Sequence, residues 1–104
     1  MVTVEVYRDA AGRVRGFRST GHANFDDYGR DIVCAAVSAI TQTAVLGVLE
    51  PAAVKQAPGH LECRLRHDAA GDAAQALFET MVLGLREVER QYPEQVRVRD
   101  VKLS

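Results

Sequence analysis

The stretch that decides the fold is residues 31–50, DIVCAAVSAITQTAVLGVLE. From Ile32 it carries no charged side chain until Glu50, so it predicts a helix that is apolar around most of its circumference. Pro51 stops this helix, because proline cannot continue a helix and disfavours helical geometry in the residue before it. A helix of this kind is expected to be buried in the fold.

The length of this apolar segment is close to the lower limit of a membrane span. Its serine, threonine and glutamine side chains, and the compact pattern that flanks it, favour a buried helix instead. A single sheet covers only one side of such a helix, so its other side is expected to meet a second helix or a second subunit. We therefore predict no membrane partner, and a homodimer in which this helix contributes to the interface.

Strands and turns are predicted on both sides of the helix. Val2, Val4 and Val6 alternate with polar residues, as in a strand with one buried face. The expected elements are a strand over 2–7, a turn at 9–12, a strand over 13–19, a helix over 31–50, a hairpin over 52–66 around Pro58-Gly59, an amphipathic helix over 71–91, and a closing strand over 96–103. A register change or a bulge is expected near Asp100.

This order, ββαββαβ, predicts an α+β fold in which two helices pack on a mixed, largely antiparallel sheet. A chain of 104 residues is the size of one domain, so residues 1–104 are expected to form a single domain. The net charge of -1 and a pI near 6.3 indicate no general attraction to nucleic acid or to anionic membranes.

The two cysteines, Cys34 and Cys63, are expected to differ in role. Cys63 alternates with Leu61 and Leu65 on one face of a strand, which is typical of a small buried apolar group. Their number alone leaves a disulfide between them open. Two cysteines in a chain without a secretory signal nevertheless favour a reduced, cytoplasmic setting.

Cys34 and His22 are a candidate nucleophile and base. If Asp31 is the N-cap of the helix, Cys34 falls in the first turn, where free N–H groups and the helix dipole favour a thiolate. His22 lies twelve residues upstream and could accept the thiol proton. Together they supply the minimum for covalent acyl transfer.

Two other interpretations of these residues stay open. The histidine and the cysteine could be unrelated in space. A metal site is the weaker alternative: its candidate ligands are His22, Asp26, Asp27, Asp31 and Cys34. No pair among them has the close Cys-x-x-Cys or His-x-x-x-His spacing that is typical of zinc sites.

The motif itself resembles a known signature. Gly21-His22-Ala23, five further residues, and then GRDIVCAAVSAI at 29–40 are similar to the signature of the ribosomal-processing cysteine protease Prp family, the YsxB-like proteins. The resemblance implies that Cys34 is the nucleophile and His22 the catalytic histidine. It also implies supporting positions at Gly21, Asp31 and Ser38, and no cofactor or metal. We expect Asp31 mainly to cap the helix, and Ser38 to contact either backbone or substrate.

The resemblance also implies a substrate. Members of this family remove a short N-terminal extension, after a phenylalanine, from a large-subunit ribosomal protein during ribosome maturation. They are homodimers, and their reaction requires no direct contact with nucleic acid. The polar loop over 24–30 has Gly29 as a possible hinge. We expect the free enzyme to hold His22 and Cys34 apart until the substrate orders this loop.

A non-catalytic ribosome- or RNA-binding α+β module is the alternative function. It depends on four arginines at strand spacing, which could form one basic stripe: Arg64, Arg66, Arg97 and Arg99. An ordinary solvated sheet face, with acidic residues between the arginines, explains the same pattern.

Overall fold

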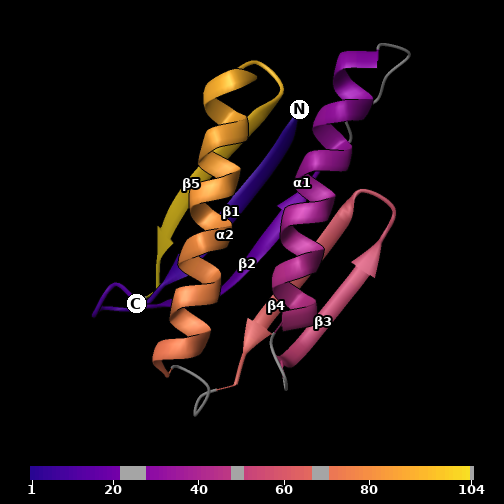
Figure 1. Ribbon diagram of the computed structural model, residues 1–104. Coiled ribbons are helices and arrows are strands. Elements are labelled where there is room, and N and C mark those ends of the chain that lie inside the picture. The colour runs from indigo at the N-terminus through magenta and orange to yellow at the C-terminus, as the bar shows by residue number, and fades with distance from the viewer. Residues whose placement is uncertain (22–27, 48–50, 67–70, 104) are drawn as a thin grey trace.

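The elements of the computed structural model follow the predicted order (Figure 1). The structure describes residues 1–21, 28–47, 51–66 and 71–103. Its elements are β1 (Val2–Arg8), β2 (Val14–Thr20), α1 (Tyr28–Gly47), β3 (Pro51–Ala57), β4 (His60–Leu65), α2 (Asp72–Gln91) and β5 (Val96–Lys102). The prediction of two hairpins, two helices and a closing strand is therefore confirmed.

The sheet has the strand order β3-β4-β2-β1-β5. Neighbouring strands run antiparallel except for β5, which pairs in parallel with β1. Both helices lie on the same face of this sheet (Figure 1), and the opposite face is uncovered by any other described element. The α+β class and the mixed, largely antiparallel sheet are as predicted.

The core lies between the sheet and the two helices. Val2, Val4 and Val6 point into it from β1, as the alternation predicted. The amphipathic helix α2 buries four side chains against the sheet: Phe78, Met81, Val82 and Leu85. The rings of Phe17 on β2 and Phe78 pack with their centroids 6.1 Å apart. Helix α1 packs along α2. The second helix therefore covers part of the surface of α1 that the sheet leaves uncovered.

The predicted start of the first helix was wrong by three residues. Helix α1 begins at Tyr28, so Asp31 is its fourth residue and is not the N-cap. The helix ends at Gly47, and residues 48–50 lie outside the described part of the chain. Tyr28, Gly29 and Arg30, predicted as loop, belong to the first turn. In the described ranges, neither helix is long and apolar enough to cross a membrane.

The predicted irregularity near Asp100 was also wrong. The pairing of β5 with β1 is unbroken from Val96 to Lys102, and the register shift lies instead between Tyr7 and Arg8 in the pairing of β1 with β2. Asp100 is in phase with the buried Val96 and Val98 of β5 but is itself exposed, and its carboxylate accepts a hydrogen bond of 3.0 Å from Arg8. A charged residue in line with the buried valines had looked like a break in the alternation.

The four arginines proposed as one basic stripe are separated in the structure. Arg64 lies on β4 and Arg99 on β5, with β2 and β1 between them. The residues between them alternate in charge: the row across the open face runs Lys55, Glu62, Arg18, Glu5, Arg99. Oppositely charged cross-strand neighbours of this kind stabilise a solvated sheet face. The arrangement removes the main support for a nucleic-acid-binding surface.

Candidate active site

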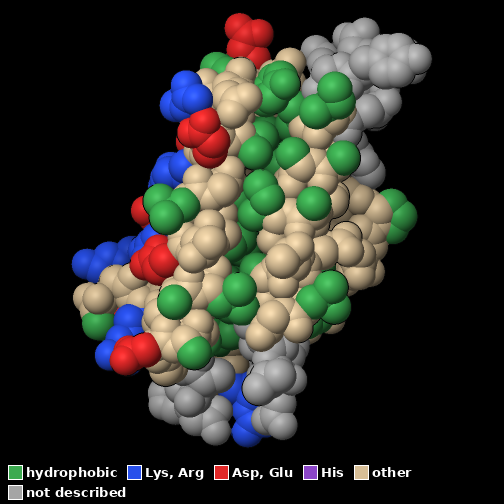
Figure 2. Space-filling view, viewed as in Figure 1, with side chains coloured by type: hydrophobic (Ala, Val, Ile, Leu, Met, Phe, Trp, Pro, Cys, Tyr) green, Lys and Arg blue, Asp and Glu red, His purple; other side chains and the backbone are tan. Residues whose placement is uncertain are grey.

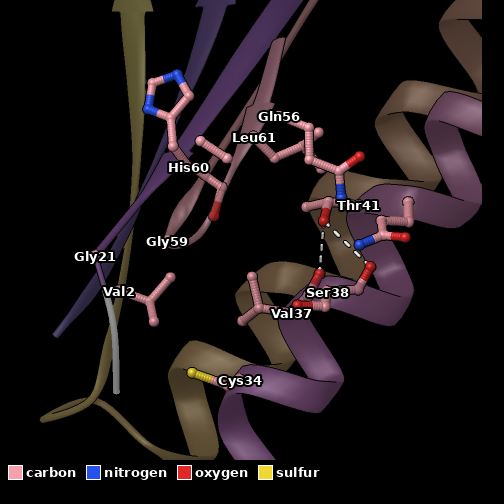
Figure 3. Close-up of a pocket in the computed structure, with 13 residues that line it drawn as sticks. Val2, Gly21, Cys34, Val37, Ser38, Thr41, Gln56, Gly59, His60 and Leu61 are labelled. Carbon is pink, nitrogen blue, oxygen red and sulfur yellow. Dashed lines mark hydrogen bonds between the residues drawn. The ribbon is translucent and has the colours of Figure 1, made fainter. Parts of the chain in front are cut away.

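A groove of about 310 Å³ lies between α1 and the part of the sheet next to the β3–β4 hairpin (Figure 3). Helix α1 forms one wall, and the end of β2, the start of β1 and the β3–β4 hairpin form the other. The α1 wall consists of Cys34, Val37, Ser38, Thr41 and Gln42. The volume is at the lower end of the range usual for ligand pockets, and the described residues leave the groove partly open to solvent.

Cys34 lines this groove from the second turn of α1. Its side chain is half-buried and packs against the hydrophobic core, and Figure 3 shows the sulfur pointing toward the side of the groove where Val2 and Gly21 lie. The predicted first-turn position was wrong, because the helix begins six residues earlier, at Tyr28. The helix dipole acts mainly within the first turn, so it has little effect on a thiol at this position.

Gly21 brings the chain to the same groove at the end where Cys34 lies. Its N–H donates a hydrogen bond of 3.0 Å to the carbonyl oxygen of Gly59. Its φ angle is 103°, and a Cβ atom at this position would clash with the carbonyl oxygen of Met1. These two constraints give a steric reason for glycine here. His22 follows Gly21 in the chain and lies outside the described residues, as do 23–27, which include Asp26 and Asp27.

A different histidine, His60, also borders the groove, but its ring is turned away from Cys34 (Figure 3). His60 opposes Thr20 across the β2–β4 ladder, and its Nε2 lies 3.9 Å from a carboxylate oxygen of Glu62 on the same strand. Residues two apart on a strand share a face, so the ring lies on the uncovered side of the sheet. His60 is therefore poorly placed to deprotonate Cys34.

Ser38 lies one helical turn beyond Cys34 and lines the groove with an exposed side chain. Its carbonyl oxygen accepts a hydrogen bond of 3.3 Å from the Thr41 hydroxyl. The predicted role of the Ser38 side chain, contact with backbone or with substrate, stays a prediction. Asp31 lies in the first turn of α1, and its side chain is outside the described part of the structure.

Sequence reasoning missed the sheet side of the groove. Gln56, Gly59 and Leu61 belong to the β3–β4 hairpin and lie beside α1 only because of the strand order. No local pattern marks them. Gln42, by contrast, is spaced eight residues from Cys34, which on a helix predicts the same side, and this signal could have been used.

Cys63 differs from Cys34 in its surroundings. Neither cysteine is in a disulfide, and Cys63 is fully buried in the core between the sheet and the helices. Burial raises the pKa of the Cys63 thiol to about 11, because the thiolate is disfavoured away from water. The prediction of a small buried apolar group is confirmed. Cys63 has neither the access nor the ionisation that a nucleophile needs.

This difference predicts the pattern of thiol alkylation. At pH 8 only about one Cys63 thiol in a thousand is ionised, so iodoacetamide is expected to add one group to the native chain, at Cys34, and two groups after unfolding in urea. Intact-mass spectrometry over time measures both. A native Cys34→Ser variant that still takes up one group at the same rate would contradict the assignment.

Comparison with known proteins identifies the family of this chain. The family model described as Cysteine protease Prp matches residues 1–97. The ribosomal processing cysteine protease Prp of Staphylococcus aureus is 32% identical over 104 residues, which cover 94% of this chain and 97% of that protein.

Two solved structures of the protease Prp from S. aureus have a similar fold. One is a complex with a substrate peptide, with a TM-score of 0.87 and 30% identity, covering 97% of this chain and 100% of the other. The second holds a covalently linked product peptide, with a TM-score of 0.86, 30% identity and the same coverage. The sequence match over nearly the whole chain, together with an open groove that contains a cysteine, leads to one conclusion: this chain belongs to the cysteine protease Prp family.

Proposed function

We propose that the protein is a cysteine endopeptidase that removes a short N-terminal extension from a large-subunit ribosomal protein during ribosome maturation. The observation that carries this proposal is the position of Cys34 in the wall of an open groove, in a chain of the Prp family. The S. aureus relatives bind a substrate peptide and a covalently linked product peptide, which supports peptide cleavage through a covalent intermediate.

In the proposed mechanism, Cys34 is the nucleophile and His22 the general base. His22 accepts the proton from Sγ of Cys34, and the sulfur attacks the carbonyl carbon of the scissile peptide bond. The tetrahedral intermediate collapses when His22 gives its proton to the leaving amine, which breaks the C–N bond and leaves a thioester. Water, deprotonated by His22, then hydrolyses the thioester and restores the thiol.

The first turn of α1 is the proposed source of the oxyanion donors. The N–H groups at the start of a helix have no intrahelical acceptor, and in α1 they include those of residues 28–30. The Cα–Cβ bond of a helical residue tilts toward the N-terminus of the helix, so the Cys34 side chain leans toward this turn. A carbonyl attacked by the sulfur would then develop its negative charge near these donors.

The family resemblance supplies the finer expectations. Cleavage is expected after a phenylalanine of the extension, with Gly21, Asp31 and Ser38 in supporting roles. We infer that residues 1–104 act as one catalytic domain, and that the protein works in the cytoplasm, where ribosome subunits are assembled in bacteria. Neither a cofactor nor bound nucleic acid takes part in the proposed steps.

The experiment that tests this function uses a synthetic peptide that spans the extension and the first mature residues of the host's own large-subunit ribosomal protein. Liquid chromatography with mass spectrometry should find a single cut, after phenylalanine. A peptide of the same composition in scrambled order is the control and should stay intact. Equal cleavage of both peptides, or cleavage of neither by purified protein, would contradict the proposal.

We further propose that the protein is a homodimer that pairs through the outer face of the two helices. Figure 2 shows hydrophobic side chains gathered along α1 and α2 on the side away from the sheet. Leu46 is 83% exposed there and Leu83 is 71% exposed. Between the helices lies a cavity of about 380 Å³, whose wall includes Ile40 and Met81. Apolar surfaces of this kind mark protein interfaces, and a two-fold axis would bury the same patch on both copies.

A charge placed in this patch should weaken the dimer. Leu83→Glu is expected to raise the dimer dissociation constant about tenfold or more, because the carboxylate would lose water on association. Sedimentation velocity over a concentration series measures this change. Val54→Glu is the matched control, since Val54 is also an exposed hydrophobic residue but lies on β3. A monomeric wild-type protein at micromolar concentration would contradict the dimer.

A further inference from the structure

We propose that Gln42 and Gln56 are positioning residues that hydrogen-bond the main chain of an extended peptide in the groove, about three to four residues from the scissile bond. This inference rests on the proposed peptidase function, and it deepens that function by locating where the substrate is held away from the reacting atoms. Both glutamines line the groove that contains Cys34.

The α1 wall of the groove sets the distance. Cys34, Ser38 and Gln42 follow one another at intervals of four residues, so they form a line along one side of the helix. Eight residues of α-helix rise about 12 Å. An extended peptide rises about 3.3 Å per residue, so a peptide that lies along this wall passes Gln42 about three to four residues from the bond attacked by Cys34.

Gln56 comes from the facing wall. It lies on β3, which is the edge strand of the sheet, and it opposes Leu61 of β4. Leu61 is buried on the helix side of the sheet, so Gln56 also faces that side. In Figure 3 the Gln56 side chain reaches from β3 toward α1, above Thr41. A peptide in the groove would therefore have one glutamine on each side.

Both amides are available for a ligand. Their side chains are exposed, and within the described ranges neither makes a hydrogen bond to the protein. Thr41, the polar neighbour between them, is already used, because its hydroxyl donates a hydrogen bond of 2.8 Å to the carbonyl oxygen of Val37. The free polar groups at this end of the groove are thus two carboxamides, each of which can donate and accept.

A third glutamine in the same protein shows the proposed contact. The Gln75 side chain accepts a hydrogen bond of 2.8 Å from the N–H of Val14 and donates one of 2.8 Å to the carbonyl oxygen of Val14. One carboxamide therefore satisfies both main-chain groups of a residue in extended conformation. Gln42 or Gln56 could hold a residue of a bound peptide in this way.

The floor of the groove suits the other face of such a peptide. Val2, Val37 and Leu61 lie there and are buried. Side chains alternate along an extended peptide, so apolar ones would contact this floor while the main chain meets the two amides above it. The substrate class that fits is an extended peptide with apolar residues at alternate positions on one side of the cleavage site.

The test compares cleavage of a full-length peptide with cleavage of two shortened peptides. Each is shortened from one end only, until two residues remain between that end and the scissile bond. Wild-type enzyme is expected to lose about tenfold in kcat/KM when one of the two sides is shortened, through KM rather than kcat. Gln42→Ala and Gln56→Ala should lose a similar factor with the full-length peptide and almost nothing further with the shortened one. Gln91→Ala, at an exposed helical glutamine outside the groove, is the matched control.

The outcomes separate this inference from the function on which it rests. Glutamine variants that keep the wild-type ratio between long and short peptides would overturn the inference while the peptidase function stands. Wild-type protein that cleaves no peptide would overturn both. Because both side chains are exposed and make no hydrogen bond within the described ranges, the variants should melt at the wild-type temperature, and circular dichroism checks this.

Discussion

Cys34→Ala is expected to lower the rate of peptide cleavage by about ten thousand-fold, to the level of the uncatalysed background in a routine assay. The methyl group cannot form the thioester, so the covalent route is removed and not merely slowed. The fold should persist, because Cys34 is only half-buried and alanine is a good helix former. Initial rates with the extension peptide, at matched circular dichroism and melting temperature, measure the effect.

Cys63 provides the matched control for this prediction. Cys63→Ala removes the other thiol of the chain from a buried site in the core. It is expected to lower the melting temperature, because a small cavity is left, but to keep cleavage within about twofold of the wild type at a temperature where the variant is folded. Loss of cleavage in Cys63→Ala, or retention of more than about one per cent in Cys34→Ala, would contradict the assignment of the nucleophile.

His22→Ala is expected to lower kcat/KM by about a thousand-fold or more, because the thiol then lacks the base that activates it and the leaving amine lacks its proton donor. Initial rates with the extension peptide, at matched circular dichroism and melting temperature, measure the loss.

His60→Ala is the control that makes this prediction specific. His22 follows a groove residue in the chain, and His60 borders the groove. The His60 ring, however, faces the uncovered side of the sheet, near Glu62. Its removal should leave kcat within about twofold of the wild type. If His60→Ala lost activity as severely as His22→Ala, the roles of the two histidines would have to be exchanged.

The fold was largely predictable because, in most of the chain, the hydrophobic periodicity and the turn-forming residues indicate the same helices and strands. The alternation of Val2, Val4 and Val6 and the three- and four-residue spacing around Phe78 each match what the structure buries. The errors came where tertiary contacts override local pattern. Asp100 accepts hydrogen bonds from arginines of β1 and α2, which no local window contains. The start of α1 at Tyr28 was missed because an aspartate before an apolar run also looks like a cap.

The candidate site was predictable on one wall only. Cys34 and Ser38 share a helix, so their common face follows from spacing. The opposite wall depends on β4 lying next to β2, a pairing between residues forty or more positions apart that spacing cannot reveal. Gly21 is explained only by the structure, since both its positive φ and its contact with Met1 arise from the way β1 and β2 end.

The central claim is that Cys34 forms a thioester with the N-terminal product of the cleaved peptide. Wild-type protein mixed with excess extension peptide and quenched in acid within the first turnovers should show an intact mass equal to protein plus peptide minus the released amine fragment. Tandem mass spectrometry should place this addition on Cys34, and neutral hydroxylamine should remove it. Release of both products with no addition in a burst-phase time course, or an addition on any other residue, would contradict the claim.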